Sequence, residues 1–365
     1  MKTYVTSILA CSLSILSSWA YACDLTESHS QLHACIQKAY QGPVSTWPAP
    51  TIDAGVQWQE LSALPDIAPA PQNNPVTEAK IQLGKQLFFD PLLSRNQDVA
   101  CASCHQPELG FSDGASVSTG HMQRTGRRNS PSIVMSGFTH TPFWDGRTTS
   151  LEEQSLKPIE DPVEMGFSID QLVLRLQTSM TYKTQFAAAF AAPISAQTIA
   201  QALASYQRSV LPHATAFEQF MRGNREALNA KQLHGLHIFR TKGRCMNCHN
   251  GVALSDDQFH NLGLTYYGRQ YEDLGRYEVT ENAADVGRFR TPSLRLVGQT
   301  GPWMHNGLFP HLWGVINMYN AGMPQNKPRA DQLDDPLFPI TSPLIKPLGL
   351  TELERENLEA FLRSL

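Results

Sequence analysis

Two short motifs constrain this 365-residue chain more than any other feature: residues 101–105 read CASCH and residues 245–249 read CMNCH. A CxxC pair can bind zinc or carry out thiol redox chemistry, but zinc requires four ligands at compatible spacing, and these two pairs lie far apart. A haem held by two thioether bonds needs two cysteines at this spacing and an adjacent histidine that binds the iron. We therefore expect two c-type haems, attached through Cys101, Cys104 and His105 and through Cys245, Cys248 and His249.

The N-terminus has the composition of an export signal. A positively charged start is followed by an apolar stretch over residues 5–19, and residues 20–22 (AYA) fit the small-x-small cleavage rule. We expect residues 1–22 to be a signal peptide and the mature protein to reside in the periplasm. A lipoprotein signal that acylates Cys23 fits poorly with the bulky Tyr21. No other apolar run reaches spanning length, so we expect no stable membrane insertion.

Cysteine usage predicts one disulfide. Cleavage of the signal leaves six cysteines, four of them in the two motifs. The other two, Cys23 and Cys35, lie in a compartment that permits disulfides. We expect them to pair and to anchor the N-terminal extension, with two free thiols as the alternative.

Composition and periodicity set the fold class. The chain is 41% hydrophobic with a formal net charge of −4, which allows a sizeable core and gives no reason to expect a nucleic-acid partner. Both halves run from a helix through a CxxCH motif and a long glycine-dotted loop to further helices, which is a weak internal repeat. We expect a mainly α fold of two cytochrome c-like haem domains with long irregular loops, at residues 76–225 and 226–365, after an extension at residues 23–75.

Several helices are predicted individually. Capping signals and helical spacing place helices from Thr77, from Ser150, over residues 168–178, 181–191, 196–211 and 311–320, and from Thr351 to the C-terminus.

Beyond the motifs, the sequence resembles the bacterial dihaem cytochrome c peroxidase family, which includes the MauG-like proteins. The resemblance covers residues 76–365. It rests on ordered blocks at residues 87–91 (LFFDP), 126–131 (GRRNSP), 143–147 (FWDGR), 162–165 (PVEM), 290–295 (RTPSLR) and 304–307 (MHNG). It implies that hydrogen peroxide reacts at the N-terminal haem, and that the C-terminal haem receives electrons and passes them on.

The resemblance also implies catalytic roles for three residues. Glu164 matches the distal acid–base group, and Gln154 matches a second polar group in the same pocket. A carboxylate there can take a proton from bound peroxide and return it to the departing oxygen. Trp144 matches the aromatic group between the two haems. The structural alternatives are a carboxylate that caps a helix or pairs with an arginine, and a core tryptophan.

Further metal ligands follow from the same resemblance. His121 matches a labile ligand of the N-terminal haem that leaves on reductive activation, with a solvated loop histidine as the alternative. A calcium ion between the domains is implied by Asn129, Thr300 and Pro302, the last two through backbone carbonyls, because oxygen ligands suit calcium.

The sixth ligand of the C-terminal haem departs from the cytochrome-oxidising peroxidases, which use methionine. The family's position falls on Tyr319, as in MauG-like members, and Met318 is the alternative. Neighbouring helical residues point about 100° apart, so both cannot ligate without a change of register. A tyrosinate lowers the potential of the iron, whereas a thioether raises it.

The sequence is compatible with three functions. The first is an oxidoreductase of the cytochrome c peroxidase type that consumes hydrogen peroxide with electrons from a small cytochrome c or copper protein. The second is MauG-like oxidation of tyrosine or tryptophan in a partner protein, favoured if Tyr319 ligates. The third is an electron-transfer cytochrome without peroxide chemistry, against which Glu164 argues.

Overall fold

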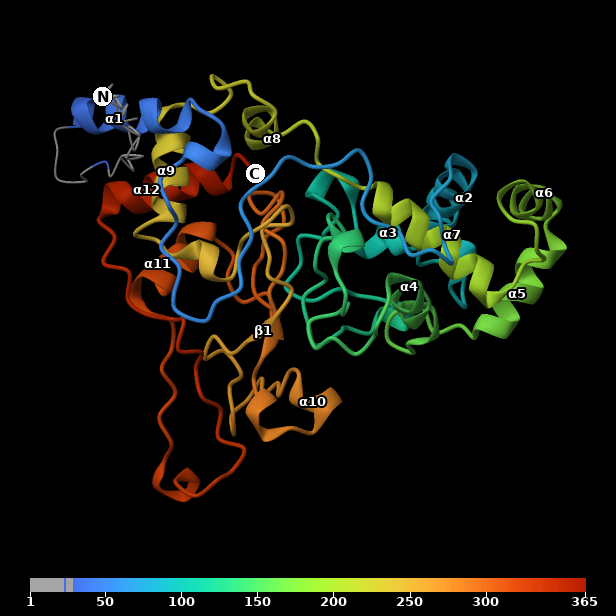
Figure 1. Ribbon diagram of the computed structural model, residues 1–365. Helices are drawn as coiled ribbons and strands as arrows, with labels where there is room; N and C mark the ends of the chain where they lie inside the picture. Colours follow the sequence, from blue (N-terminus) through green and yellow to red (C-terminus); the bar gives the residue numbers. More distant parts are fainter. Residues whose placement is uncertain (1–22, 24–28) are drawn as a thin grey trace, which may run out of the picture.

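The computed structural model describes residue 23 and residues 29–365, so the predicted signal peptide lies outside the described residues. The described part is mainly helical, as predicted, and forms two lobes (Figure 1). No helix within it has the length and apolar character needed to span a membrane. The helices are α1 (His29–Tyr40), α2 (Glu78–Phe89), α3 (Cys101–Cys104), α4 (Leu151–Glu160), α5 (Ile169–Thr178), α6 (Met180–Ala189), α7 (Ala196–Ser209), α8 (Ala216–Met221), α9 (Ala230–Arg240), α10 (Tyr277–Thr280), α11 (Leu312–Ala321) and α12 (Glu352–Leu362). Two short strands, β1 (Phe259–His260) and β2 (Phe289–Arg290), pair antiparallel.

The first lobe contains α2 to α7 around one hydrophobic core. Helix α2 begins as predicted, where the Thr77 side chain accepts a hydrogen bond from the Lys80 backbone N–H. Its buried face, which includes Leu87, packs on α7. Gly84 makes this crossing close, because a Cβ atom there would lie 2.0 Å from the Ala202 carbonyl oxygen. This helix pair supports the chain that leads into the first CxxCH motif.

The second lobe repeats this arrangement with α9 and α12. Helix α9 precedes the second motif and crosses α12 at Gly235, where a Cβ atom would lie 2.0 Å from the Asn357 carbonyl oxygen. The rings of Phe239 and Phe361 meet edge to face across the crossing, with centroids 5.3 Å apart. Helix α12 begins with the predicted capping box at Thr351. In both lobes, therefore, a helix before the motif crosses a later helix at a glycine.

Helix α8 packs in the second core, although it lies before residue 225. Phe217 and Phe220 of α8 are fully buried in that core, and the Phe217 ring lies 5.5 Å from that of Phe361. The Phe217 backbone N–H also donates to the Ser364 carbonyl at 3.0 Å. The apolar face of α8 has its partners in the second lobe, so the chain passes between lobes before residue 216.

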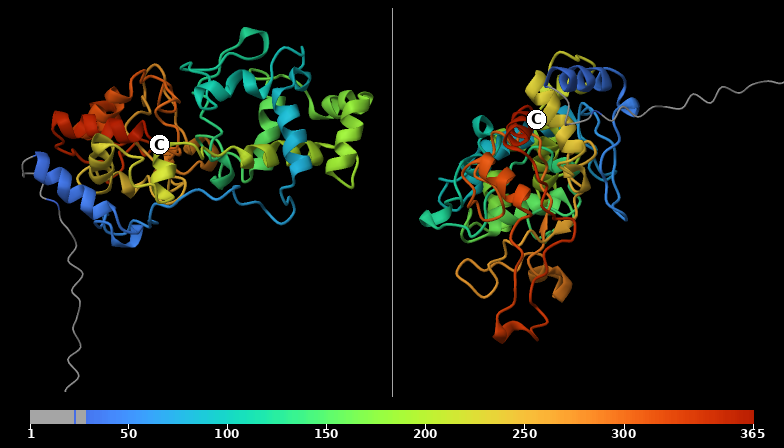
Figure 2. Two further views of the ribbon diagram at one scale, coloured as in Figure 1. Left: turned by 90° about the horizontal axis from the view of Figure 1, so that it is seen from above. Right: turned by 90° about the vertical axis from the view of Figure 1, so that its left-hand side faces the viewer.

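The N-terminal extension also packs on the second lobe. Cys23 and Cys35 form the predicted disulfide, with Cα atoms 5.8 Å apart. From α1 onward, residues 41–75, here called the strap, run along the second lobe and then to the first (Figure 2). Trp47 and Leu61 of the strap are buried in the second core. The extension is thus part of the folded structure.

Candidate functional site

Both CxxCH motifs border one cavity of about 1000 Å³ between the lobes. His105 from the first motif and Cys245, Cys248 and His249 from the second all line it. This volume is at the upper end of the roughly 300–1,000 Å³ that a single ligand pocket usually has. The cavity therefore brings together residues 144 positions apart in sequence, His105 and His249.

Each motif histidine is oriented by a backbone carbonyl. The Nδ1 atom of His105 lies 3.2 Å from the Phe111 oxygen, and that of His249 lies 3.0 Å from the Leu254 oxygen. A carbonyl only accepts hydrogen bonds, so Nδ1 carries the proton and Nε2 keeps its lone pair. Burial lowers the pKa of both imidazoles, which keeps them neutral. Both histidines thus present the form that binds a metal through Nε2.

The buried surroundings of the motif cysteines favour uncharged sulfur over a thiolate. None of the four forms a disulfide, and burial raises the pKa of Cys101 and of Cys245 to about 12. Cys248 lies within 4.8 Å of the ligand atoms of Asp256 and His260, a set that could hold a cation only while this sulfur is free. A thioether satisfies these positions without placing a thiolate in an apolar site. Paired sulfurs, an oriented imidazole and an adjoining cavity fit a c-type haem at each motif.

Gln154 and Glu164 line the cavity together with His105. Helix α4 carries Gln154, and its start is fixed by Ser150, whose side chain accepts from the Glu153 N–H. The Oε1 atom of Gln154 is buried without a hydrogen-bond partner in the described part of the protein, so it is available to a ligand.

Burial, with Asp161 nearby, raises the pKa of Glu164 to about 7, although Arg147 opposes this. Within the described chain Glu164 forms no ion pair, so the alternative of a structural pairing with arginine is not seen. A carboxyl group with a pKa near neutrality can both give and take a proton.

Trp144 is buried on the cavity wall, in a loop that both lobes hold in place. Its Nε1 donates to the Asn129 carbonyl at 2.9 Å. Arg276 donates to the carbonyls of Asp145 and Gly146 at 2.8 and 2.7 Å, from the second half of the chain. Trp144 is therefore a fixed aromatic group in the cavity that both motifs share.

Two further residues of this wall had no predicted role. Arg128 makes a bidentate ion pair with Asp273 at 2.7 Å for each contact, and it also pairs with Asp145. His305 stacks on Phe289 with ring centroids 3.6 Å apart, and its Nε2 has no partner in the described part. Both lie in blocks that the family resemblance had marked, which is the one signal by which the sequence could have indicated them.

Tyr319 and Met318 are separated by the geometry of α11. Tyr319 lines the cavity with His249, whereas Met318 is absent from the cavity lining. Burial raises the pKa of Tyr319, so the phenolate form requires a positive charge close by. A ferric iron bound to His249 would provide that charge.

His121 and the expected calcium ligands occupy different places. His121 is buried, its backbone N–H donates to the Glu164 carbonyl at 2.8 Å, and its ring lies against Gly166 rather than on the cavity lining. Asn129, Thr300 and Pro302 do share the cavity lining. The Asn129 side chain donates to the Ala115 carbonyl at 2.9 Å, which leaves its amide oxygen free to bind a cation.

Comparisons with known proteins show the family of this chain. A family model described as di-haem cytochrome c peroxidase matches residues 78–226. The chain is 37% identical over 335 residues to cytochrome-c peroxidase IdrP1 of Denitromonas iodatirespirans, covering 84% of this chain and 86% of that protein. It is 36% identical over 327 residues to the methylamine utilization protein MauG of Methylorubrum extorquens, covering 87% and 88%.

A solved structure shows the same architecture. The crystal structure of a MauG-like protein associated with microbial copper homeostasis superposes with a TM-score of 0.73 at 32% identity, over 86% of this chain and 95% of that one.

Proposed function

Since the chain belongs to the di-haem cytochrome c peroxidase family, which includes the MauG proteins, we propose that it is a periplasmic enzyme that reduces hydrogen peroxide at the first motif. The observation that carries this proposal is the pair Gln154 and Glu164, which bring an unpaired amide and a near-neutral carboxyl group to the cavity that His105 lines. A simple electron-transfer cytochrome has no use for such groups beside its iron.

The reaction consumes one peroxide, two electrons and two protons and releases two waters. Cys101, Cys104 and His105 would hold one haem, and Cys245, Cys248 and His249 would hold the other; the iron would supply the peroxide site and the electron exchange. Glu164 takes the proton of the incoming peroxide and returns one to the departing oxygen. Gln154 orients the peroxide through its unpaired oxygen.

Electrons enter at the second motif, from a small cytochrome c or copper protein, and reach the first along Trp144. The support for this is that Trp144 lines the cavity common to both motifs and is fixed by its bond to Asn129. Calcium bound by Asn129, Thr300 and Pro302 would stiffen this wall. His121 would bind the iron at the first motif only if its loop moved, because its ring lies against Gly166.

A second candidate is MauG-like oxidation of tyrosine or tryptophan in a partner protein. Tyr319 favours it, because this residue and not Met318 lines the cavity at His249. An anionic oxygen ligand would favour the oxidised iron, so the second haem would serve better to hold oxidising equivalents than to collect electrons from a high-potential donor.

Peroxide turnover by the haem-loaded mature protein tests the proposal. Reduced small cytochrome c and hydrogen peroxide are mixed with the protein, and donor oxidation is followed by absorbance. We expect two donors to be oxidised for each peroxide. Peroxide consumption without donor turnover, together with a peroxide-oxidised spectrum that persists for minutes, would favour the second candidate. If peroxide is not consumed in either case, the proposal fails.

A further inference from the structure

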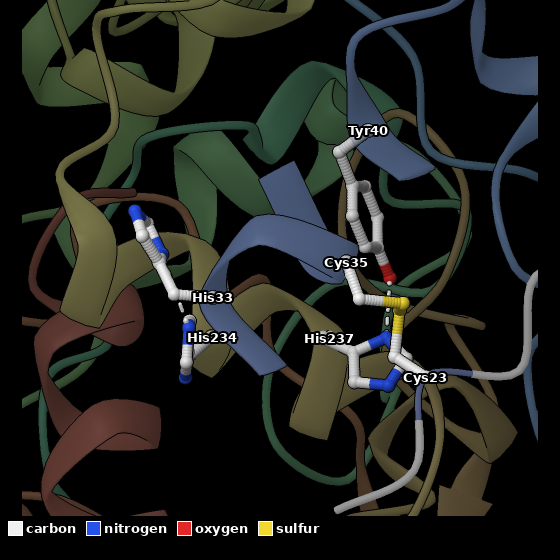
Figure 3. The surroundings of a disulfide bond; sticks show 6 residues. All are labelled: Cys23, His33, Cys35, Tyr40, His234 and His237. Carbon is white, nitrogen blue, oxygen red and sulfur yellow. Dashed lines mark hydrogen bonds between the residues drawn. A yellow bond between two sulfur atoms is a disulfide. The ribbon is translucent and has the colours of Figure 1, made fainter. Parts of the chain in front are cut away.

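We propose that helices α1 and α9 together form a binding site for a single Zn²⁺ or Cu²⁺ ion, with His33 and His234 as ligands. This site is separate from both haem motifs and independent of the peroxide chemistry. It lies where the N-terminal extension meets the helix that precedes the second motif (Figure 3).

The two imidazoles are placed as ligands of one ion would be. The Nδ1 atom of His33 and the Nε2 atom of His234 lie 3.3 Å apart, although the residues are 201 positions apart in sequence. Two nitrogens bound to one tetrahedral metal at about 2.0–2.1 Å lie roughly 3.3 Å from each other. The ring planes are inclined by 32°, with centroids 5.4 Å apart, so the rings are not stacked on each other.

The site combines burial with access. His234 is only 4% exposed, whereas His33 is partly exposed, so an ion can enter from the His33 side. Imidazole nitrogens select zinc, copper and nickel over calcium or magnesium, which prefer oxygen.

The surrounding contacts hold both helices in place before any ion binds. The Cys23–Cys35 disulfide lies on α1, and Ile36 and Tyr40 are fully buried against the second core. The Tyr40 hydroxyl bonds to the Nδ1 atom of His237 at 3.1 Å, one turn from His234 (Figure 3). A preformed pair of ligands loses little conformational entropy on binding, which favours affinity.

The test uses the haem-loaded mature protein, in which Cys248 is a thioether and cannot bind zinc with Asp256 and His260. Zn²⁺ is titrated in competition with a chromophoric chelator. We expect one Zn²⁺ per chain, with affinity reduced more than about tenfold in His33→Gln. The matched control, His311→Gln, changes an exposed histidine at the start of α11 and should bind as the unmodified protein does.

A second measurement identifies the ligands directly. Cu²⁺ added at one equivalent should give an electron paramagnetic resonance signal coupled to at least two nitrogens, reduced by one nitrogen in His33→Gln. Unchanged haem absorption in the variant shows that it is folded. Equal Zn²⁺ binding by His33→Gln and the unmodified protein, or a copper signal unaffected by the substitution, would overturn the site and leave a plain histidine–histidine hydrogen bond.

Discussion

The two lobes share one frame around the CxxCH motif and differ in what faces it. In each, a glycine crossing supports the helix before the motif, and a backbone carbonyl fixes the motif histidine, through Phe111 in the first lobe and Leu254 in the second. On the cavity side, the first lobe presents Gln154 and Glu164, whereas the second presents Tyr319. A repeated frame can therefore support two chemistries, because a few side chains on later segments set the environment of each site.

The lobes also differ in how they are covered. In the second lobe the strap lies directly on the motif: Asn247 donates to the Thr51 carbonyl at 3.1 Å and accepts from the Asp53 N–H at 2.7 Å. The Gln59 N–H donates to Asn250 at 3.0 Å. The first motif has no such cover from the strap within the described chain. The strap therefore stabilises the second motif through hydrogen bonds that the first motif does not receive from it.

The largest expected effect concerns the polar side of the first lobe. Glu164→Gln removes the proton-accepting group but keeps its size, so we expect the rate constant for reaction with peroxide to fall by about 10²–10⁴-fold. Stopped-flow absorbance measures this rate. Glu160→Gln, at the exposed end of α4, is the matched control and should react normally. Equal rates in the two variants would remove the proposed distinction between the lobes.

The second largest effect is expected from substituting Tyr319, which faces the second motif. If Tyr319 binds the second haem as proposed, Tyr319→Phe would remove an anionic oxygen, so we expect the potential of that haem to rise by on the order of 200 mV, within the wide range that axial ligands set. Spectroelectrochemical titration measures the potential. Met318→Leu is the matched control, because it alters the neighbouring residue of α11 that does not line the cavity. A shift in Met318→Leu alone would assign the ligand to Met318 instead.

Acid stability should expose a third difference, centred on His237 in the second lobe. Burial lowers the pKa of His237 to about 4, so the folded protein keeps it neutral while the unfolded chain binds a proton below about pH 6.5. Stability should therefore fall as the pH drops from about 6.5 to about 4, by up to roughly 3 kcal/mol from this residue.

Urea unfolding at pH 7.5 and pH 5 measures the loss. His237→Gln should lose less stability between these two pH values than the unmodified protein, whereas His311→Gln should behave normally. If His237→Gln kept the full pH dependence, other groups would account for it.

The smallest expected effect concerns the strap. Asp53 pairs with Arg244, next to the second motif, and with Lys346 at 2.9 Å. These pairs are partly exposed, so Asp53→Asn should destabilise the second lobe by only about 0.5–1 kcal/mol, and less at high salt. Thermal unfolding at two salt concentrations measures this, with Asp66→Asn, an exposed strap residue, as control. A salt-independent loss would show that the two ion pairs do not account for the contribution of Asp53.

The sequence by itself determined the local features of this protein. Capping residues predicted the starts of α2, α4 and α12, because a cap is formed between residues three positions apart. The proposed haem attachment is local for the same reason, since the cysteines and the histidine of each motif are close in sequence. The disulfide could also be predicted from the sequence, because only Cys23 and Cys35 remained to pair once the four motif cysteines were assigned to haem.

Tertiary structure alone decided which distant residues meet. Arg128 and Asp273 are 145 positions apart and His33 and His234 are 201 apart, and no local pattern connects either pair. The placement of α8 in the second core likewise depended on where its phenylalanines found apolar partners. Hydrophobic burial is non-directional and does not depend on sequence separation, so the packing of the two cores decided which distant segments border the cavity.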